Sequence, residues 1–134
     1  MRRLIVGCVV VCVVAPALGV FSALAQAAFP FDRDMVLDAR PMRGSKRLPV
    51  LSIDQNGRAQ IDLWCKRGRG QAIIAGDTIT ITVASMNDEP CAAERAQADD
   101  DMIAALASTT GWTIRGDIVA LTGTKTLRFR LATN

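Results

Sequence analysis

Short alternating segments separated by glycine-containing turns are the feature that most limits how this chain can fold. Residues 58–65 place Ala, Ile, Leu and Cys on one side and Arg, Gln, Asp and Trp on the other. Residues 78–83 alternate Thr with Ile and Val. A period of two residues predicts half-exposed antiparallel strands. Tight hairpins are predicted at three dipeptides that suit positive φ, namely Asn56-Gly57, Gly76-Asp77 and Gly116-Asp117.

One segment departs from this strand pattern. Residues 92–108 are rich in Ala, Glu, Arg, Gln, Met and Leu, which favour helices, and we expect the helix to end before Gly111. Its apolar stripe at helical spacing consists of Ala98, Met102, Ile103 and Leu106. The three consecutive aspartates at 99–101 point in different directions on a helix, so they are expected on a solvated face and not around one Ca²⁺ ion.

This order of elements predicts an α+β fold. We expect a curved antiparallel sheet or an incomplete barrel of about 7 short strands, with one helix packed on it or closing one end. The length of 134 residues suits a single domain.

The beginning of the chain has the three parts of a secretory signal peptide. Arg2 and Arg3 precede an apolar run over residues 4–14, and Ala25-Gln26-Ala27 forms a small-x-small site. We therefore expect residues 1–27 to be a signal peptide cleaved near Ala27, and residues 28–134 to be a periplasmic or secreted domain. Two alternatives are an uncleaved anchor over residues 4–25 and a lipoprotein site at Cys8. If the signal peptide is cleaved, we expect the protein to contact the membrane only through that segment, before cleavage.

Cleavage would leave two of the four cysteines. Cys8 and Cys12 leave with the signal peptide, whereas Cys65 and Cys91 remain. An oxidising compartment favours a disulfide between them. The basic neighbours of Cys65 in Lys-Arg-Gly-Arg-Gly leave two other hypotheses, an activated thiol and a nucleic-acid-binding loop. A solvated hairpin loop after a strand ending at Cys65 explains the same residues without either activity.

Composition excludes several kinds of chemistry. The chain has no His and no Tyr, which excludes a Ser-His-Asp or Cys-His nucleophile and a His-ligated metal centre. Without Arg2 and Arg3, the 16 basic residues become 14 against 13 acidic ones, a net charge of +1 with little general attraction for nucleic acid. We expect no enzymatic activity, no cofactor, no metal and no nucleic-acid partner.

The order of motifs resembles the META domain family, the HslJ-like heat-shock and envelope proteins. The residues that carry the resemblance are Trp64, Cys65, Gly76, Asp77, Cys91, Trp112, Gly116, Asp117 and Phe129. They fall at a strand end, a hairpin, the start of the helix, a second hairpin and the closing strand. The chain departs from the family at Trp64 and Lys66, where the family has Gly and Asn.

This resemblance implies an exported envelope or stress-response domain with no established reaction, and some members have been compared to small lipid-binding pilot proteins. Two functions follow. The first is a protein-interaction module whose partner is an unknown envelope protein. The second is a carrier for an apolar ligand such as an acyl chain, held between sheet and helix by Met102, Ile103 and Leu106. A hollow interior would favour the carrier, and a packed interior would favour the interaction module.

Overall fold

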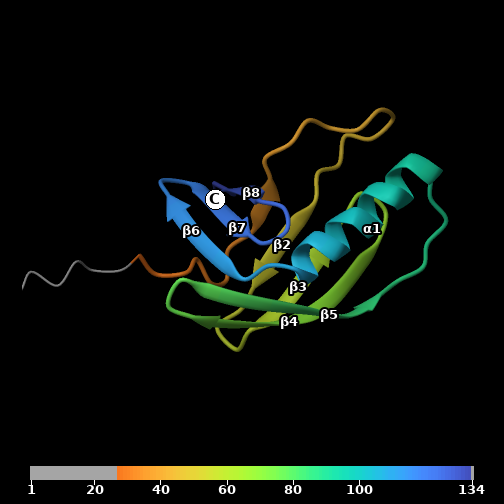
Figure 1. The fold of residues 1–134 in the computed structure, drawn as a ribbon. Helices are drawn as coiled ribbons and strands as arrows, with labels where there is room; N and C mark the ends of the chain where they lie inside the picture. Colours follow the sequence, from red (N-terminus) through yellow and green to blue (C-terminus); the bar gives the residue numbers. More distant parts are fainter. Residues whose placement is uncertain (1–26, 134) are drawn as a thin grey trace, which may run out of the picture.

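The computed structural model describes residues 27–133 (Figure 1). The predicted signal peptide lies outside this range except for Ala27, so its cleavage stays a prediction. The elements in chain order are β1 (Met35–Leu37), β2 (Val50–Ile53), β3 (Arg58–Asp62), β4 (Arg67–Ala75), β5 (Thr78–Met86), α1 (Ala93–Ala107), β6 (Gly111–Arg115), β7 (Ile118–Thr122) and β8 (Leu127–Leu131). Within the described residues, no helix has the length and apolar character needed to cross a membrane.

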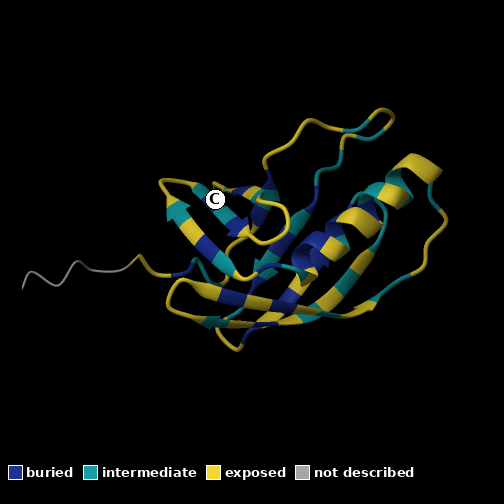
Figure 2. Ribbon diagram, viewed as in Figure 1, coloured by how far each residue is buried: buried dark blue, intermediate teal, exposed yellow. Residues whose placement is uncertain are grey.

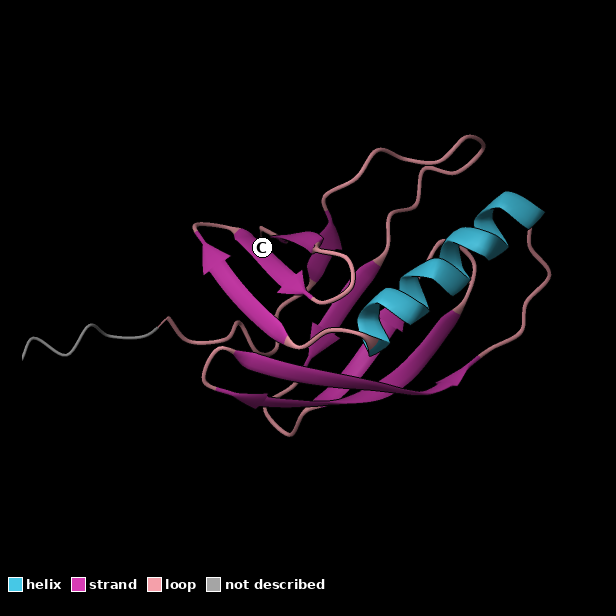
Figure 3. Ribbon diagram, in the orientation of Figure 1, coloured by secondary structure: helices cyan, strands magenta, loops and turns pink. Residues whose placement is uncertain are grey.

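The eight strands form a closed antiparallel barrel (Figure 3). Each strand pairs with its neighbour in sequence, and β8 returns to β1 with Leu131 opposite Met35. The sequence predicted an incomplete barrel of about 7 strands, and the structure corrects both points. Closure depends on pairing between the two ends of the domain, and turn signals between adjacent strands carry no information about it. The three-residue β1 is also too short to show alternation.

The junction between β5 and β6 is the least paired part of the barrel. These strands share one residue pair, Thr78 with Gly111. Two backbone bonds flank it, from Ile79 N to Thr110 O at 3.1 Å and from Trp112 N to Asp77 O at 2.9 Å. α1 connects the two strands and packs against β5 (Figure 1). The helix therefore covers the edge of β5 that β6 does not reach, which protects it from unwanted strand pairing.

The hairpin turns lie where the dipeptides predict them, with one change of conformation. Gly76 and Gly116 each have φ of +60° at the first of two central positions, as a type II′ turn requires. In the β2–β3 turn Gly57 has a positive φ of +80°, whereas Asn56 does not. Asp54 Oδ1 instead accepts hydrogen bonds from the N–H groups of Asn56 and Arg58, both at 2.9 Å. That side chain fixes the turn.

The barrel interior is filled by apolar side chains from every strand and from α1. Figure 2 shows the buried positions along these elements. Met102 and Leu106 of α1 cover the end near the β3–β4 turn. At the opposite end, near the β4–β5 turn, the buried Phe29 ring lies 5.1 Å from the Trp112 ring in an edge-to-face arrangement. The barrel is thus a packed core that is closed at both ends, and it is not a channel.

A bulge in the β4–β5 pairing brings Gly70 so close to the backbone of β5 that a side chain does not fit there. The β4–β5 register shifts between Arg69 and Gly70, and a Cβ at Gly70 would overlap the Thr82 carbonyl oxygen. We expect Gly70→Ala to lower the free energy of unfolding by about 1–3 kcal/mol, since overpacking forces the backbone to move. Urea denaturation measures this loss. Ile73→Ala on the same strand is the control, because Ile73 is 68% exposed and its replacement should change stability by less than about 0.5 kcal/mol. Equal effects of the two changes would contradict the role of Gly70.

Candidate functional site

The turn between β3 and β4 is the centre of the candidate site. Residues 63–66 close it with a hydrogen bond from Leu63 N to Lys66 O at 2.8 Å. β3 ends at Asp62 and β4 begins at Arg67. Arg67 and Arg69 therefore lie on a strand, and the expectation that the basic residues after Cys65 form a solvated hairpin loop up to Gly70 was wrong. Arg67 pairs with Asp62 at 3.1 Å on the outer face of the barrel.

A disulfide joins this turn to the start of the helix. Cys65 lies in the turn and Cys91 lies two residues before α1, with their Cα atoms 6.1 Å apart. This is the pairing that the sequence favours. A sulfur held in a disulfide is not a thiolate, so the bonded form offers no activated nucleophile beside Lys66.

Asp99 holds the same turn from the helix side. Its carboxylate accepts three consecutive backbone hydrogen bonds, from Trp64 N at 2.9 Å, Cys65 N at 3.0 Å and Lys66 N at 2.8 Å. Asp99 is fully buried, so the prediction that it lies on a solvated face was wrong. A buried carboxylate needs hydrogen-bond donors, and the turn provides three N–H groups that point to one place.

The other two aspartates of the run have different surroundings. Asp100 Oδ1 lies 2.6 Å from Lys66 Nζ, and this hydrogen bond raises the pKa of the Lys66 ammonium. Asp101 is exposed and accepts a hydrogen bond from Gln97 Nε2 at 3.1 Å. The three carboxylates diverge as helical geometry requires, and in residues 27–133 no group of three or more His, Cys, Asp or Glu residues is arranged to hold a metal ion.

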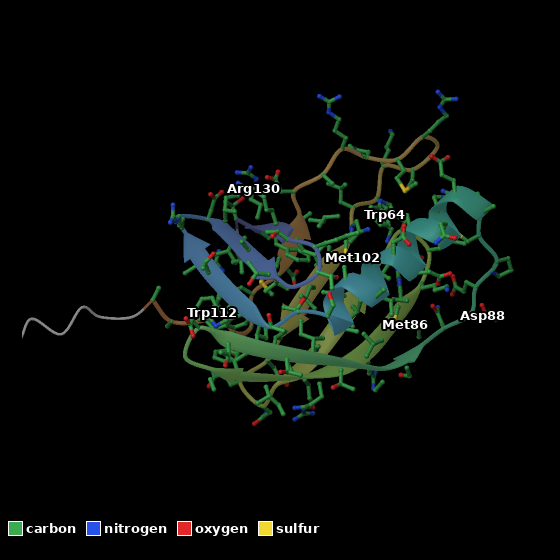
Figure 4. The ribbon with its side chains drawn as sticks, in the orientation of Figure 1. Trp64, Met86, Asp88, Met102, Trp112 and Arg130 are labelled. Carbon is green, nitrogen blue, oxygen red and sulfur yellow. A yellow bond between two sulfur atoms is a disulfide. The ribbon has the colours of Figure 1, made fainter. Side chains whose placement is uncertain are left out.

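Trp64, in the turn held by Asp99 and the disulfide, lines an apolar groove on the outside of the barrel. Figure 4 shows Trp64 beside α1. The groove has a volume of about 280 Å³ and runs between α1 and the adjoining ends of β1 and β8. Its apolar lining consists of Leu37, Trp64, Ala98, Met102, Ala105 and Leu127. Asp101 and Lys125 add one negative and one positive charge. The groove stays open because the residues that α1 contributes to this part of its wall include the small side chains of Ala98 and Ala105.

The two tryptophans differ in how their indole nitrogens are paired. Trp112 Nε1 donates to Gly76 O at 2.8 Å. Trp64 Nε1 is, among the described residues, the one buried side-chain nitrogen or oxygen without a hydrogen-bond partner. Leaving a buried donor unpaired costs about 1–3 kcal/mol, and such groups are uncommon in native proteins.

The motif residues do not gather in one place, and Figure 4 shows Trp64 and Trp112 far apart in the domain. Trp64 and Cys65 lie in the β3–β4 turn, and Cys91 is joined to that turn by the disulfide. Trp112 contacts the Gly76-Asp77 turn. In the β6–β7 turn after Gly116, Asp117 pairs with Arg130 at 3.1 Å and its charge raises the pKa of Arg130. Phe129 is buried in the barrel. The structure does not bring these residues into one site.

The residues expected to line a ligand cavity lie mostly in packed surroundings. Leu106 is 1% exposed and Met102 5% exposed. The gap between them and the facing side chains of β2, β3 and β8 has no room for a water molecule. Ile103 is half-buried against the same core. Met102 alone of the three also lines the external groove beside Trp64.

Two larger hollows lie along the strands, one of about 430 Å³ over β2, β3 and β4 and one of about 630 Å³ over β3, β4 and the end of β5. Both include Gln60 and Arg69, and most of their lining is charged or polar. Neither contains an aromatic side chain or a convergent set of catalytic groups.

The fold and the fixed helix define a class of protein: a small closed β-barrel whose helix α1 is held to the β3–β4 turn by Asp99 and a disulfide. The META domain family model matches residues 32–134, so the chain belongs to the META domain family. An NMR structure of a protein from Burkholderia xenovorans has a TM-score of 0.62 and 18% identity, covering 78% of this chain and 84% of that chain.

A second NMR structure has a TM-score of 0.61 and 18% identity, covering 74% of this chain and 88% of that chain. At this identity the two likenesses establish the fold. No curated protein matches the chain.

Proposed function

We propose that the chain is an exported, non-enzymatic META domain that acts by binding another protein in the cell envelope, in its maintenance or its response to stress. The observation that carries this proposal is the packed barrel. Its interior is filled, and its two ends are covered by α1 and by Phe29 with Trp112. A domain without an internal chamber acts through its outer surface.

Export is supported by the cysteine pair. A Cys65–Cys91 disulfide suits an oxidising compartment, which the signal-peptide pattern also predicts. The absence of His from the sequence supports a non-enzymatic role, because the commonest general base is missing. The periplasm accords with the disulfide and with the signal-peptide pattern, because it is an oxidising compartment that proteins reach by export.

The carrier hypothesis has less support. It places an acyl chain between sheet and helix, where Leu106 and Met102 contact the side chains of the strands without space for water. A ligand there would have to displace side chains that form the core, and interiors packed to crystal-like density resist such changes.

Mass spectrometry of protein purified from its own compartment tests the proposal. After expression of the full chain, we expect a polypeptide that begins at Ala28 and is two hydrogens lighter than the dithiol form. Under native conditions we expect no acyl ligand. Reduction with and without unfolding is the control, since the two-hydrogen difference should disappear only when the Cys65–Cys91 bond is broken. A stoichiometric bound lipid would instead establish the carrier function.

A further inference from the structure

The hollow of about 430 Å³ over β2, β3 and β4 is crossed by one row of polar side chains. The strand registers place Ser52 opposite Gln60 and Gln60 opposite Arg69. The β1–β2 register extends this row to Asp34, one residue before β1. The neighbours of these residues along β1, β2 and β3 are buried, so the row faces outward. All four side chains line a hollow whose volume lies within the usual range of about 300–1,000 Å³ for small-molecule sites.

The two ends of this row carry opposite charges. Asp34 provides a carboxylate at one end and Arg69 a guanidinium at the other, with the neutral groups of Ser52 and Gln60 between them. Three strand spacings of about 4.8 Å separate the end residues, which is about 14 Å of backbone. In residues 27–133, neither Asp34 nor Arg69 takes part in an ion pair. The two charges are therefore too far apart to neutralise each other.

The other charged groups of the hollow preserve this polarity. Arg58 Nε pairs with Asp54 Oδ2 at 3.3 Å, so these two charges offset each other. Asp32 lies two residues before Asp34 and lines the same hollow. Its carboxylate accepts from Gln55 Nε2, a neutral donor, at 3.1 Å and keeps its charge. The hollow therefore favours a cation at its Asp34 end and an anion at its Arg69 end.

The length of the row indicates the size of the ligand. An extended chain advances by about 3.3–3.6 Å per residue, so two or three residues with a contact of about 3 Å at each end bridge the row. The termini of a peptide are an ammonium and a carboxylate at neutral pH. Its peptide bonds can donate to and accept from the Gln60 amide and the Ser52 hydroxyl. A short zwitterionic peptide complements each group of the row.

We propose that this hollow binds short peptides of two or three residues with free termini, with the ammonium against Asp34 and the carboxylate against Arg69. The lining contains no aromatic side chain, so it gives little selectivity for the side chains of the peptide. This binding is separate from the proposed protein-interaction function, and either one can fail without the other.

Titration with trialanine, followed by NMR, tests the proposal. Protein from the full-length gene is labelled with ¹⁵N and processed by its own cells. We expect the backbone amide resonances of Ser52, Gln60 and Arg69 to shift saturably. N-acetyl-trialanine and trialanine amide each lack one terminal charge, and each should bind about tenfold more weakly. The absence of saturable shifts at millimolar trialanine, or equal binding of trialanine and either capped form, would overturn the proposal.

Matched variants assign each terminus to its partner. Arg69→Gln should weaken binding of trialanine by about tenfold and leave binding of trialanine amide unchanged, because the amide has no charge to lose. Arg115→Gln is the control, since Arg115 is also exposed and lies outside the hollow. Asp34→Asn should weaken trialanine and leave N-acetyl-trialanine unchanged. If Arg69→Gln weakened the acid and the amide equally, the assignment of the carboxylate to Arg69 would be wrong.

A peptide with both termini capped separates a short peptide from an internal segment of a protein. N-acetyl-Lys-Ala-Glu amide carries its charges on long side chains, which lose more rotamer freedom on binding than fixed termini do. We expect it to bind at least about tenfold more weakly than trialanine. If it bound as tightly and shifted the same resonances, the hollow would recognise charged side chains of a partner protein. That result would overturn the short-peptide proposal and support the interaction function.

Discussion

Replacing Asp99 by Ala is expected to lower the free energy of unfolding by about 3–5 kcal/mol, since removing one partner of a buried, hydrogen-bonded charge leaves the other groups unpaired. In the native protein the carboxylate accepts from the backbone of Trp64, Cys65 and Lys66 at 2.8–3.0 Å. Ala leaves these three donors without an acceptor and leaves a cavity between the helix and the turn. Urea unfolding monitored by circular dichroism measures the loss, which should appear as a lower midpoint at unchanged slope.

Asp101→Ala is the matched control for Asp99→Ala. Asp101 is on the same helix, two residues later, but it is exposed. Its removal should change stability by less than about 0.5 kcal/mol. Asp99→Asn should fall between the two, because the amide keeps one acceptor oxygen but directs an NH₂ group at the backbone donors. If Asp99→Ala and Asp101→Ala had the same small effect, the Asp99 anchor would not contribute to stability.

Removing the disulfide is expected to lower stability by about 3.5 kcal/mol, which is the loop-closure entropy that such a crosslink removes from the unfolded chain. The bond joins positions 26 residues apart, so its loss frees a long loop in the unfolded state. The double variant Cys65→Ser/Cys91→Ser measures this without a reductant. Addition of a reductant to that variant is the control and should change nothing. A denaturation midpoint equal to that of the oxidised protein would contradict the prediction.

The two losses should not be independent. Asp99 accepts from the backbone N–H of Cys65 itself, so the carboxylate and the disulfide act on the same turn. A shared turn predicts a coupling energy of about 0.5–3 kcal/mol when Asp99→Ala is combined with the double Ser variant. When the Asp99 contacts or the disulfide alone is removed, the one that remains still restrains the helix. When both are removed, α1 is held by the burial of Met102 and Leu106.

The local elements could be predicted from the sequence because their causes are local. The Gly76-Asp77 and Gly116-Asp117 turns and the bounds of α1 depend on residues within a few positions of each other. Closure of the barrel depends on β1 pairing with β8, two segments from opposite ends of the domain. Hydrophobic alternation does not specify which strand is the partner, so this pairing could not be predicted.

The two contacts that hold α1 to the β3–β4 turn, the disulfide and the Asp99 carboxylate, could be predicted only in part. The cysteine pair follows from counting, but Asp99 was grouped with its two acidic neighbours. Its position carried a signal, because Asp99, Met102 and Leu106 are spaced i, i+3 and i+7 on one face of the helix. A charged residue on the apolar face of a helix needs a buried partner. That partner was a set of backbone N–H groups, which have no sequence signature.

The pairing of β1 with β8 has a consequence for how this domain can be connected to other chains. Ala132 N donates to Asp34 O at 2.9 Å, and the Arg33 guanidinium donates to Ala132 O at 2.9 Å, so the polypeptide enters and leaves the domain at adjacent points. A module with neighbouring entry and exit can be spliced into a surface loop of a host protein while both remain folded. This architecture suits reuse as an inserted cassette.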